Sequence, residues 1–388
     1  MDWLRRAMYT GFLLFLPIGH TAGAANSEFF FIFCGDSRFG SDSPKDHPEI
    51  LEQIVQEVNI RKPAFFLYGG DGPDHNTEES YRAFKACLDK LEVPYYNVVG
   101  NHDIYVKATG GYSRDNHRKL FGRTYYTFEY DDSYFIVLDS SGHGGRPWGV
   151  RASSPEQWKW MVGELEANVS KYRHTFVVTH TPPYDAPPME NHAFTDPQEA
   201  EEFVELMAKY DVTAVLCSHE HLYYRTEWEG VPYIISGGAG AVLYAPADRG
   251  GFYHYIEVHV GDEVEVRVIP VLRSIAVIPD SARVEVGDTI RFRAVGIDPL
   301  GKSVPIAPPI SASWSSGDTA IGMVDSSGVF RAVSEGKVEV VVTCGLRSGR
   351  AWVCVGETVE KGDAGEETRP FYLRKRDERG FRCPRSHS

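Results

Sequence analysis

The stretch YYNVVGNHD, residues 95–103, joins an apolar, strand-like run to a Gly-Asn-His-Asp turn. Four other apolar runs also stop just before residues that can bind a metal: FFFIFC (29–34) leads to Asp36, AFFLYG (64–69) to Asp71, TFVV (175–178) to His180, and AVLC (214–217) to His219 and His221. In open α/β sheets, ligands bind where the strands end at their carboxyl edge. The five segments therefore predict a layered α/β domain with one shared site.

The residue types at these five strand ends favour a metal centre. Carboxylate and amide oxygens mixed with imidazole nitrogens suit Zn, Fe or Mn better than Ca. A carboxylate such as that of Asp71 can bridge two cations, and ions ~3.5–4 Å apart clamp the attacking and leaving oxygens of a phosphoryl transfer. Such a centre also lowers the pKa of bound water enough to supply hydroxide near neutral pH. One histidine is then free for proton transfer.

The order of the motifs resembles that of the calcineurin-like metallophosphoesterases, which include the purple acid phosphatases. The family pattern D-x-H, G-D-x-x-D/Y, G-N-H-D/E, H and G-H-x-H is matched by DSR (36–38), GDGPD (70–74), GNHD (100–103), His180 and SHEH (218–221). The resemblance covers residues 28–272 and implies a four-layer α/β/β/α sandwich. It implies hydrolysis of phosphate esters, phosphomonoesters favoured, by attack of a metal-bound hydroxide. A phosphodiesterase of the same fold is the alternative.

The resemblance also implies a role for each matched residue. Two divalent or trivalent ions (Fe, Mn or Zn) would be held, the first by Asp36, Asp71 and His221, and the second by Asp71, Asn101, His180 and His219. His102 would be catalytic and would face the phosphoester, oriented by Asp103, and Asn101 would also contact the substrate. Five other histidines belong to none of these motifs and are expected to be structural core or surface residues: His47, His75, His117, His143 and His192.

Two departures from the family pattern matter. Arg38 stands where the family has a metal-binding His, and arginine cannot ligate a cation, so the first metal position is expected to be weak. Arg38 is instead expected to bind the substrate phosphate through its planar guanidinium group. The alternative is a salt bridge between Arg38 and a nearby carboxylate. Ser218 replaces a Gly and restricts the backbone. Asp74 fits the family pattern, but purple acid phosphatases have Tyr at this position, so no purple ferric centre is expected.

Residues 273–356 differ in sequence pattern from the preceding α/β segment. They consist of short β-rich runs separated by Gly, Ser and Pro, which is typical of a small β-sandwich. They resemble the group-2 bacterial immunoglobulin-like domains in the segments SIAVIP (274–279), VGDT (286–289), WSS (314–316), SG (327–328) and GKV (336–338). The resemblance implies an all-β sandwich with Trp314 in its core, which contacts a cell surface or a polysaccharide. It also supports a rival function, that of a surface-binding protein with a disabled phosphoesterase domain.

The two ends of the chain and its charge bear on location and partners. Residues 1–24 have the pattern of an export signal, which predicts a periplasmic or extracellular protein with no transmembrane span in its mature form. An uncleaved anchor is the alternative. Residues 357–388 are polar and expected to be disordered. The net charge of −14 argues against binding to nucleic acid, because a polyanion would be repelled. It does not exclude a small anionic phosphate ester as substrate, because a metal cluster is the largest local charge in its own site.

The six cysteines are not spaced like a disulfide scaffold. Cys34 and Cys217 are expected to be small buried hydrophobic residues at strand ends. Cys344 and Cys354 flank an expected hairpin turn, and they either pair across it or stay reduced. The loops 104–123 and 141–153 are expected to form the rim of the site.

Overall fold

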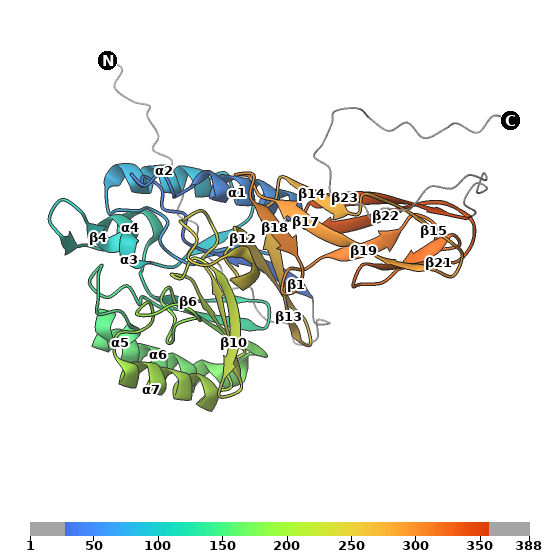
Figure 1. Cartoon of the computed structure of the whole chain (residues 1–388). Coiled ribbons are helices and arrows are strands. Elements are labelled where there is room, and N and C mark those ends of the chain that lie inside the picture. The colour runs from blue at the N-terminus through green and yellow to red at the C-terminus, as the bar shows by residue number, and fades with distance from the viewer. Residues whose placement is uncertain (1–27, 357–388) are drawn as a thin grey trace, which may run out of the picture.

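The computed structural model describes residues 28–356, which form an α/β part followed by a strand-rich C-terminal part (Figure 1). The expected export signal and C-terminal tail lie outside these residues. The first sheet has the order β13-β12-β1-β2-β3, with β1 (Phe29–Cys34), β2 (Phe66–Tyr68), β3 (Tyr95–Asn97), β12 (His254–Val260) and β13 (Val264–Pro270). The second has the order β10-β11-β9-β8-β7-β6, with β6 (Tyr126–Tyr130), β7 (Ser133–Val137), β8 (His174–Val178), β9 (Ala214–Cys217), β10 (Tyr223–Trp228) and β11 (Val231–Ser236).

Four long helices cover the outer faces of the two sheets (Figure 1). They are α1 (Glu49–Arg61) and α2 (Glu78–Leu88) on the first sheet, and α6 (Pro155–Asn168) and α7 (Pro197–Lys209) on the second. Ser154 and Asp196 cap α6 and α7 by accepting hydrogen bonds from backbone N–H groups, and each helix begins with proline. The mixed α/β fold is therefore confirmed.

Aromatic side chains fill the space between the two sheets. Phe31 and Phe65, at the first sheet, stack with ring centroids 4.9 Å apart, and Phe135 and Phe176 from the second stack at 5.0 Å. Phe31 also meets Phe135 edge to face at 5.4 Å. This buried aromatic layer holds the two sheets face to face, which completes the helix–sheet–sheet–helix order.

The C-terminal part consists of short strands in three small sheets, and it extends away from the α/β part (Figure 1). Its strands are β14 (Ser274–Ile278), β15 (Ser281–Val284), β16 (Thr289–Arg291), β17 (Arg293–Ile297), β18 (Ser303–Ile306), β19 (Ser313–Ser316), β20 (Gly322–Val324), β21 (Val329–Ala332), β22 (Gly336–Cys344) and β23 (Arg347–Val355). Phe292 and Phe330 are buried in its core. Trp314, expected to be the buried aromatic of that core, packs against it but is only partly buried. An all-β domain is compatible with this arrangement, and its immunoglobulin-like identity stays a prediction.

Polar side chains fasten the C-terminal part to α1. The Tyr255 hydroxyl donates to Glu57 at 3.0 Å, and Arg347 from β23 lies 3.7 Å from the same carboxylate. Gln53 donates both to Glu57 (3.0 Å) and to the carbonyl oxygen of Leu272, where the two parts join (3.2 Å). Glu57 and Tyr255 both belong to the α/β part, so the polar contacts named here that reach the C-terminal part are the Arg347–Glu57 ion pair and, at the join, the Gln53 hydrogen bond to Leu272.

The cysteines of the described segment are all free. Cys34 and Cys217 are buried as expected. In the β22–β23 hairpin Cys344 lies opposite Arg347, next to the turn, while Cys354 lies opposite Lys337 near the far end. Pairing of Cys344 with Cys354 is therefore wrong, because the strand register separates them. Between residues 28 and 356, no helix is long and apolar enough to cross a membrane.

His117 in α4 (Asp115–Phe121) makes folding sensitive to acid. It is buried, its ring nitrogens have no hydrogen-bond partner among the described residues, and burial lowers the pKa of His117 to about 4. The unfolded-state pKa is about 6.5, so His117 does not oppose folding above that pH, and folding becomes less favourable as the pH falls from about 6.5 to 4. We expect His117→Phe to weaken the loss of unfolding free energy between pH 7 and 5, measured by urea denaturation of metal-free protein. An unchanged loss would contradict this expectation.

Candidate metal centre

The candidate site lies where parallel strands of both sheets end. β1, β2 and β3 run parallel in the first sheet, and β8 and β9 do so in the second. Their carboxyl ends lead, in the same order, to Asp36, to Asp71, to Asn101 and His102, to His180, and to His219 and His221. The structure therefore brings together the residues of the five motif segments.

Four side chains converge on the expected second metal position. His180 Nε2 lies 3.2 Å from Asn101 Oδ1, 3.1 Å from His219 Nδ1 and 3.4 Å from Asp71 Oδ1. Ligand atoms that share an ion at about 2.0–2.2 Å lie about 3.3–3.6 Å apart in tetrahedral geometry, and adjacent octahedral ligands lie about 2.8–3.1 Å apart. The observed spacing therefore fits one ion held by these four residues.

The expected first metal position is lined by Asp36, Asp71 and His221. His221 Nε2 lies 3.5 Å from Asp36 Oδ1. These two atoms and Asp71 Oδ2 are buried and have no hydrogen-bond partner within the described part of the chain. Buried polar atoms without partners are costly, and a bound cation would satisfy them. Asp36, Asp71 and His221 are nevertheless spaced more widely than Asp71, His180 and His219, whose ligand atoms lie close enough to share one ion.

Backbone carbonyl groups orient two of the histidine ligands. His180 Nδ1 lies 2.9 Å from the carbonyl oxygen of Gly69, and His221 Nδ1 lies 2.7 Å from that of Val242. Since a carbonyl oxygen only accepts, Nδ1 carries a proton in both rings and donates it. The Nε2 atoms are thereby directed toward the metal positions, as is usual for metal-binding histidines.

The local backbone is unusual at the site. Asp36, Arg38, Asp71 and His219 all have positive φ, at 69, 60, 55 and 70°. Such strain in non-glycine residues clusters at functional sites. Gly100 is needed because an added Cβ would lie 2.2 Å from Asp71 Oδ1.

Ser218, one of the departures from the family pattern, is accommodated by two glycines. An added Cβ at Gly35 or Gly69 would lie 2.4 or 2.1 Å from the Ser218 hydroxyl oxygen. That hydroxyl donates to the carbonyl oxygen of Ser236 at 3.1 Å. The serine therefore fits beside the ligand His219 without disturbing the strand ends.

The charges at the centre are coupled. Burial opposes ionisation of Asp71, yet the neighbouring His180, His102 and Arg38 hold the pKa of Asp71 well below its ordinary value. Burial alone would lower the pKa of His180, but Asp71 raises it to about 9. Metal binding therefore displaces a proton from His180, because the ligating nitrogen of an imidazole must be unprotonated.

Arg38 lies inside the centre and contacts two carboxylates. Its Nη1 donates to Asp74 Oδ1 at 3.0 Å, and its Nε lies 3.6 Å from Asp71 Oδ2. The structure thus shows the salt-bridge alternative for Arg38, and contact with substrate remains a proposal. Burial lowers the pKa of Arg38, but Asp71 raises it, together with Tyr244, Asp36 and Asp74, so the guanidinium stays charged.

His102 is oriented by Asp74, which corrects the expected role of Asp103. His102 Nδ1 lies 2.8 Å from the carbonyl oxygen of Asp74 and 3.3 Å from Asp74 Oδ1, so it donates there and Nε2 is left for a substrate. The Asp103 carboxylate instead accepts from the backbone N–H groups of Gly100 and Asp71. Asp103 thus stabilises the Gly-Asn-His-Asp turn at the start of α3 (Asn101–Ile104), because its side chain accepts hydrogen bonds from the backbone there.

The rim of the centre contains rings that the motifs did not identify. Trp148, from the second of the two expected rim loops, meets the His219 ring edge to face at 4.5 Å, and Tyr244 stacks on His221 at 4.1 Å. His192 lies 5.8 Å from the His219 ring and 5.4 Å from that of Tyr244, so it borders the centre despite its lack of a motif. Aromatic residues in glycine-rich loops were the available signal for Trp148 and Tyr244; His192 had none.

The other loop expected at the rim, residues 104–123, contacts the loop 141–153. Tyr112 stacks on His143 with ring centroids 4.6 Å apart, and Arg114 forms an ion pair with Asp139 at 2.6 Å. The Asp139 carboxylate also accepts from the backbone N–H group at the start of the loop 141–153. The two loops therefore contact each other, and a rim role for the loop 104–123 stays a prediction.

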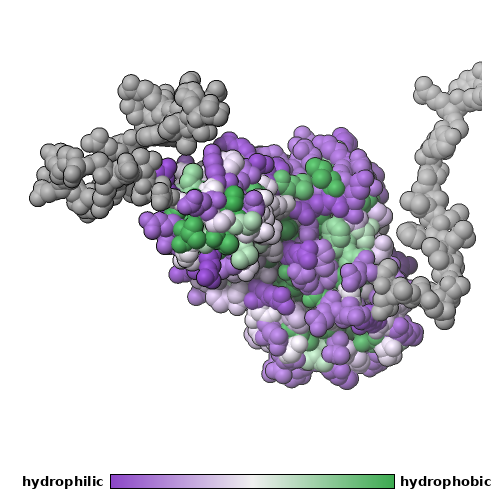
Figure 2. All heavy atoms as spheres, turned by 90° about the vertical axis from the view of Figure 1, so that its right-hand side faces the viewer, coloured by the Kyte–Doolittle hydropathy of each residue, from purple (hydrophilic) through white to green (hydrophobic). Residues whose placement is uncertain are grey.

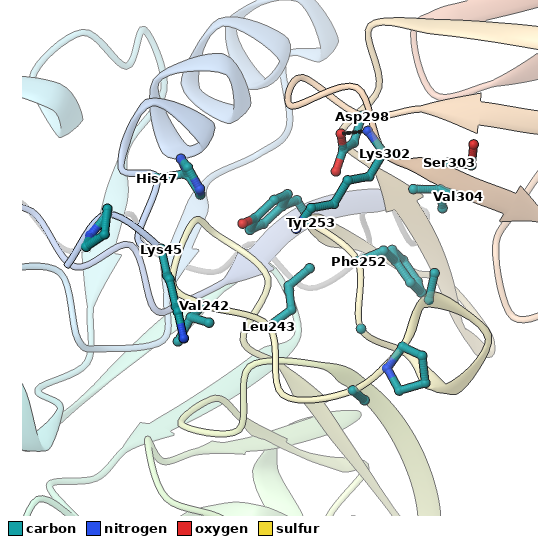
Figure 3. Close-up of a pocket in the computed structure, with 15 residues that line it drawn as sticks. Lys45, His47, Val242, Leu243, Phe252, Tyr253, Asp298, Lys302, Ser303 and Val304 are labelled. Carbon is teal, nitrogen blue, oxygen red and sulfur yellow. Dashed lines mark hydrogen bonds between the residues drawn. The ribbon is translucent and has the colours of Figure 1, made fainter.

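A cavity of about 590 Å³ lies next to the centre but is distinct from it (Figure 3). Within the loop 241–246, Tyr244 stacks on His221, whereas Val242, Leu243 and Ala245 line the cavity. Figure 3 shows Lys302 reaching from the C-terminal part toward Tyr253. None of the lining residues is a predicted metal ligand, so the metal centre lies outside this cavity.

Metal-capable side chains form two groups in the described part of the chain. The first is Asp71, His180 and His219, and the second is Asp74, His75 and His102. Hydrogen bonds and ion pairs also link the second group, in which His75 Nε2 lies 3.0 Å from Asp74 Oδ2. Like His192, His75 therefore borders the centre, although no motif includes it.

Comparison with known proteins agrees with this geometry. A probable glycerophosphodiester phosphodiesterase of Arcobacter nitrofigilis is 28% identical over 198 residues, covering 48% of this chain and 67% of that protein. Human tartrate-resistant acid phosphatase type 5 is 26% identical over 214 residues, covering 48% of this chain and 64% of that protein. The chain thus spans about two thirds of the length of these relatives.

The fold is shared with a purple acid phosphatase from yellow lupin, at a TM-score of 0.53 and 16% identity. That match covers 63% of this chain and 52% of the lupin chain. At this identity the likeness shows the fold alone. The model of the calcineurin-like phosphoesterase family matches residues 30–223, half of the chain. The chain therefore belongs to the calcineurin-like phosphoesterase family and is a hydrolase of phosphate esters.

Proposed function

We propose that this protein is an exported, metal-dependent phosphoesterase that prefers phosphomonoesters. The observation that carries the proposal is the convergence of Asp71, Asn101, His180 and His219. Beside them, the buried atoms Asp36 Oδ1, Asp71 Oδ2 and His221 Nε2 have no hydrogen-bond partner among the described residues. Fe, Mn or Zn suits this donor set. When bound, the ions would supply hydroxide near neutral pH and offset charge on the phosphoryl group.

The remaining residues would bind and protonate the substrate. His102 Nδ1 donates to Asp74, which leaves Nε2 available to the substrate. In the doubly protonated ring, the Nε2–H group can give its proton to the leaving oxygen. The Arg38 guanidinium is largely buried at the same place and can donate to phosphoryl oxygens. Trp148 and Tyr244 flank the ligands and would exclude water around an organic leaving group.

The relatives support two substrate classes. The human acid phosphatase supports a monoesterase, and the Arcobacter relative supports a diesterase as the second candidate. Reconstituted protein should hydrolyse p-nitrophenyl phosphate with a higher kcat/KM than bis(p-nitrophenyl) phosphate. The reverse order would reject the monoester preference and favour the diesterase.

The C-terminal part is proposed to be an immunoglobulin-like module that contacts a cell surface or polysaccharide. Five of the eight exposed large hydrophobic residues within residues 28–356 lie in it: Ile278, Val286, Met323, Val333 and Trp352. Figure 2 shows hydrophobic patches interrupted by hydrophilic ones on the face that this part presents. Co-sedimentation of the protein with insoluble polysaccharide, compared with the Trp352→Ala variant, tests the proposal. Absence of co-sedimentation for both would reject polysaccharide binding.

A further inference from the structure

The two oxygens of Asp71 face different cations. Oδ1 accepts from the backbone N–H of His102 at 2.8 Å and lies 3.4 Å from His180 Nε2, on the side of the second metal position. Oδ2 faces Arg38 Nε at 3.6 Å and accepts no hydrogen bond from the described residues. The guanidinium therefore lies at the oxygen that a first metal ion would use.

Arg38 is held in this place from both ends. Its backbone N–H donates to the carbonyl oxygen of Asp71 at 3.2 Å, and its φ is 60°. At the other end Nη1 donates to Asp74 Oδ1, and the side chain is only 11% exposed. A side chain fixed at both ends does not swing away freely when a cation approaches.

The two metal positions consequently differ in their donors. The second has four, from Asp71, Asn101, His180 and His219. The first keeps three: Asp36 Oδ1, Asp71 Oδ2 and His221 Nε2. An ion at the first position would also be repelled by the guanidinium, because like charges at short range disfavour each other in a buried site.

We propose that Arg38 is the resident cation of the first position. The protein then holds one metal ion tightly, at the second position, and takes a second ion only at much higher metal concentration. This inference rests on the proposed function, because it concerns the filling of the same centre. It distinguishes this chain from a variant with histidine at residue 38, in which both positions would have four protein donors.

The test is the metal content of Arg38→His. Metal-free wild type and variant are loaded with Zn or Mn, dialysed against trace metal, and analysed by mass spectrometry for ions per chain. We expect about one ion per chain for the wild type and about two for Arg38→His. The affinity for the second ion should rise by more than the ~10–100-fold that an outer-shell partner contributes. Arg38→Ala, which removes the charge without adding a ligand, should fall between them.

Arg82→His is the matched control, since Arg82 lies on α2 with a side chain 73% exposed. It should bind metal as the wild type does. Two tight ions in the wild type would overturn the inference, as would one tight ion in both the wild type and Arg38→His. Absence of metal from every variant would instead reject the proposed metal-dependent function itself, together with this inference.

Discussion

The His102→Ala variant is expected to turn over a phosphomonoester roughly 10²–10⁴-fold more slowly than the wild type, the usual contribution of a proton-transfer group. Its metal content should not change, because His102 is at the centre without being a predicted ligand. The ring donates through Nδ1 to Asp74 and leaves Nε2 for the substrate. The loss should appear in kcat, measured by steady-state kinetics beside metal analysis.

His259→Ala is the matched control for that variant. His259 lies on β12, where it stacks on Phe30 with ring centroids 5.0 Å apart, and its side chain is 29% exposed. Its removal should leave turnover and metal content as they are. Wild-type turnover in His102→Ala would exclude His102 from the mechanism.

The Asp71→Asn variant is expected to lose both metal and activity. Asp71 is the carboxylate between the two metal positions, and its replacement by an amide removes negative charge that attracts the ions. Metal affinity should fall by more than the ~10–100-fold expected for loss of an outer-shell partner, and turnover should become undetectable. Metal analysis and kinetics of dialysed protein measure both effects.

Asp89→Asn controls for this change, since Asp89 has a half-exposed side chain at the end of α2, where it pairs with Lys85. It should keep its metal. If Asp71→Asn bound metal as tightly as the wild type does, the carboxylate would have no role in the centre, and the assignment of both positions would fail.

The fold and the position of the centre were predictable because the signals are local. Each apolar run, such as residues 64–69, ends within two residues of its ligand, and parallel strands bring their carboxyl ends to one edge. Caps such as Ser154 mark the start of a helix in the same local way. These features need only a few neighbouring residues to be recognised.

The features that the sequence did not predict depend on contacts between distant segments. His192 approaches His219 only because its loop folds over the carboxyl ends of the strands. Asp74 rather than Asp103 orients His102, because the turn after β2 lies beside the turn after β3. The separation of Cys344 from Cys354 follows from strand register, which the spacing of two cysteines does not specify.

The central claim is that this chain hydrolyses phosphate esters through a bound metal. The most direct measurement is turnover of p-nitrophenyl phosphate by metal-stripped protein, titrated separately with Fe, Mn and Zn. We predict no turnover without metal, and recovery that saturates as the second metal position fills. Turnover that persists after complete removal of metal, or its absence with all three metals, would contradict the account.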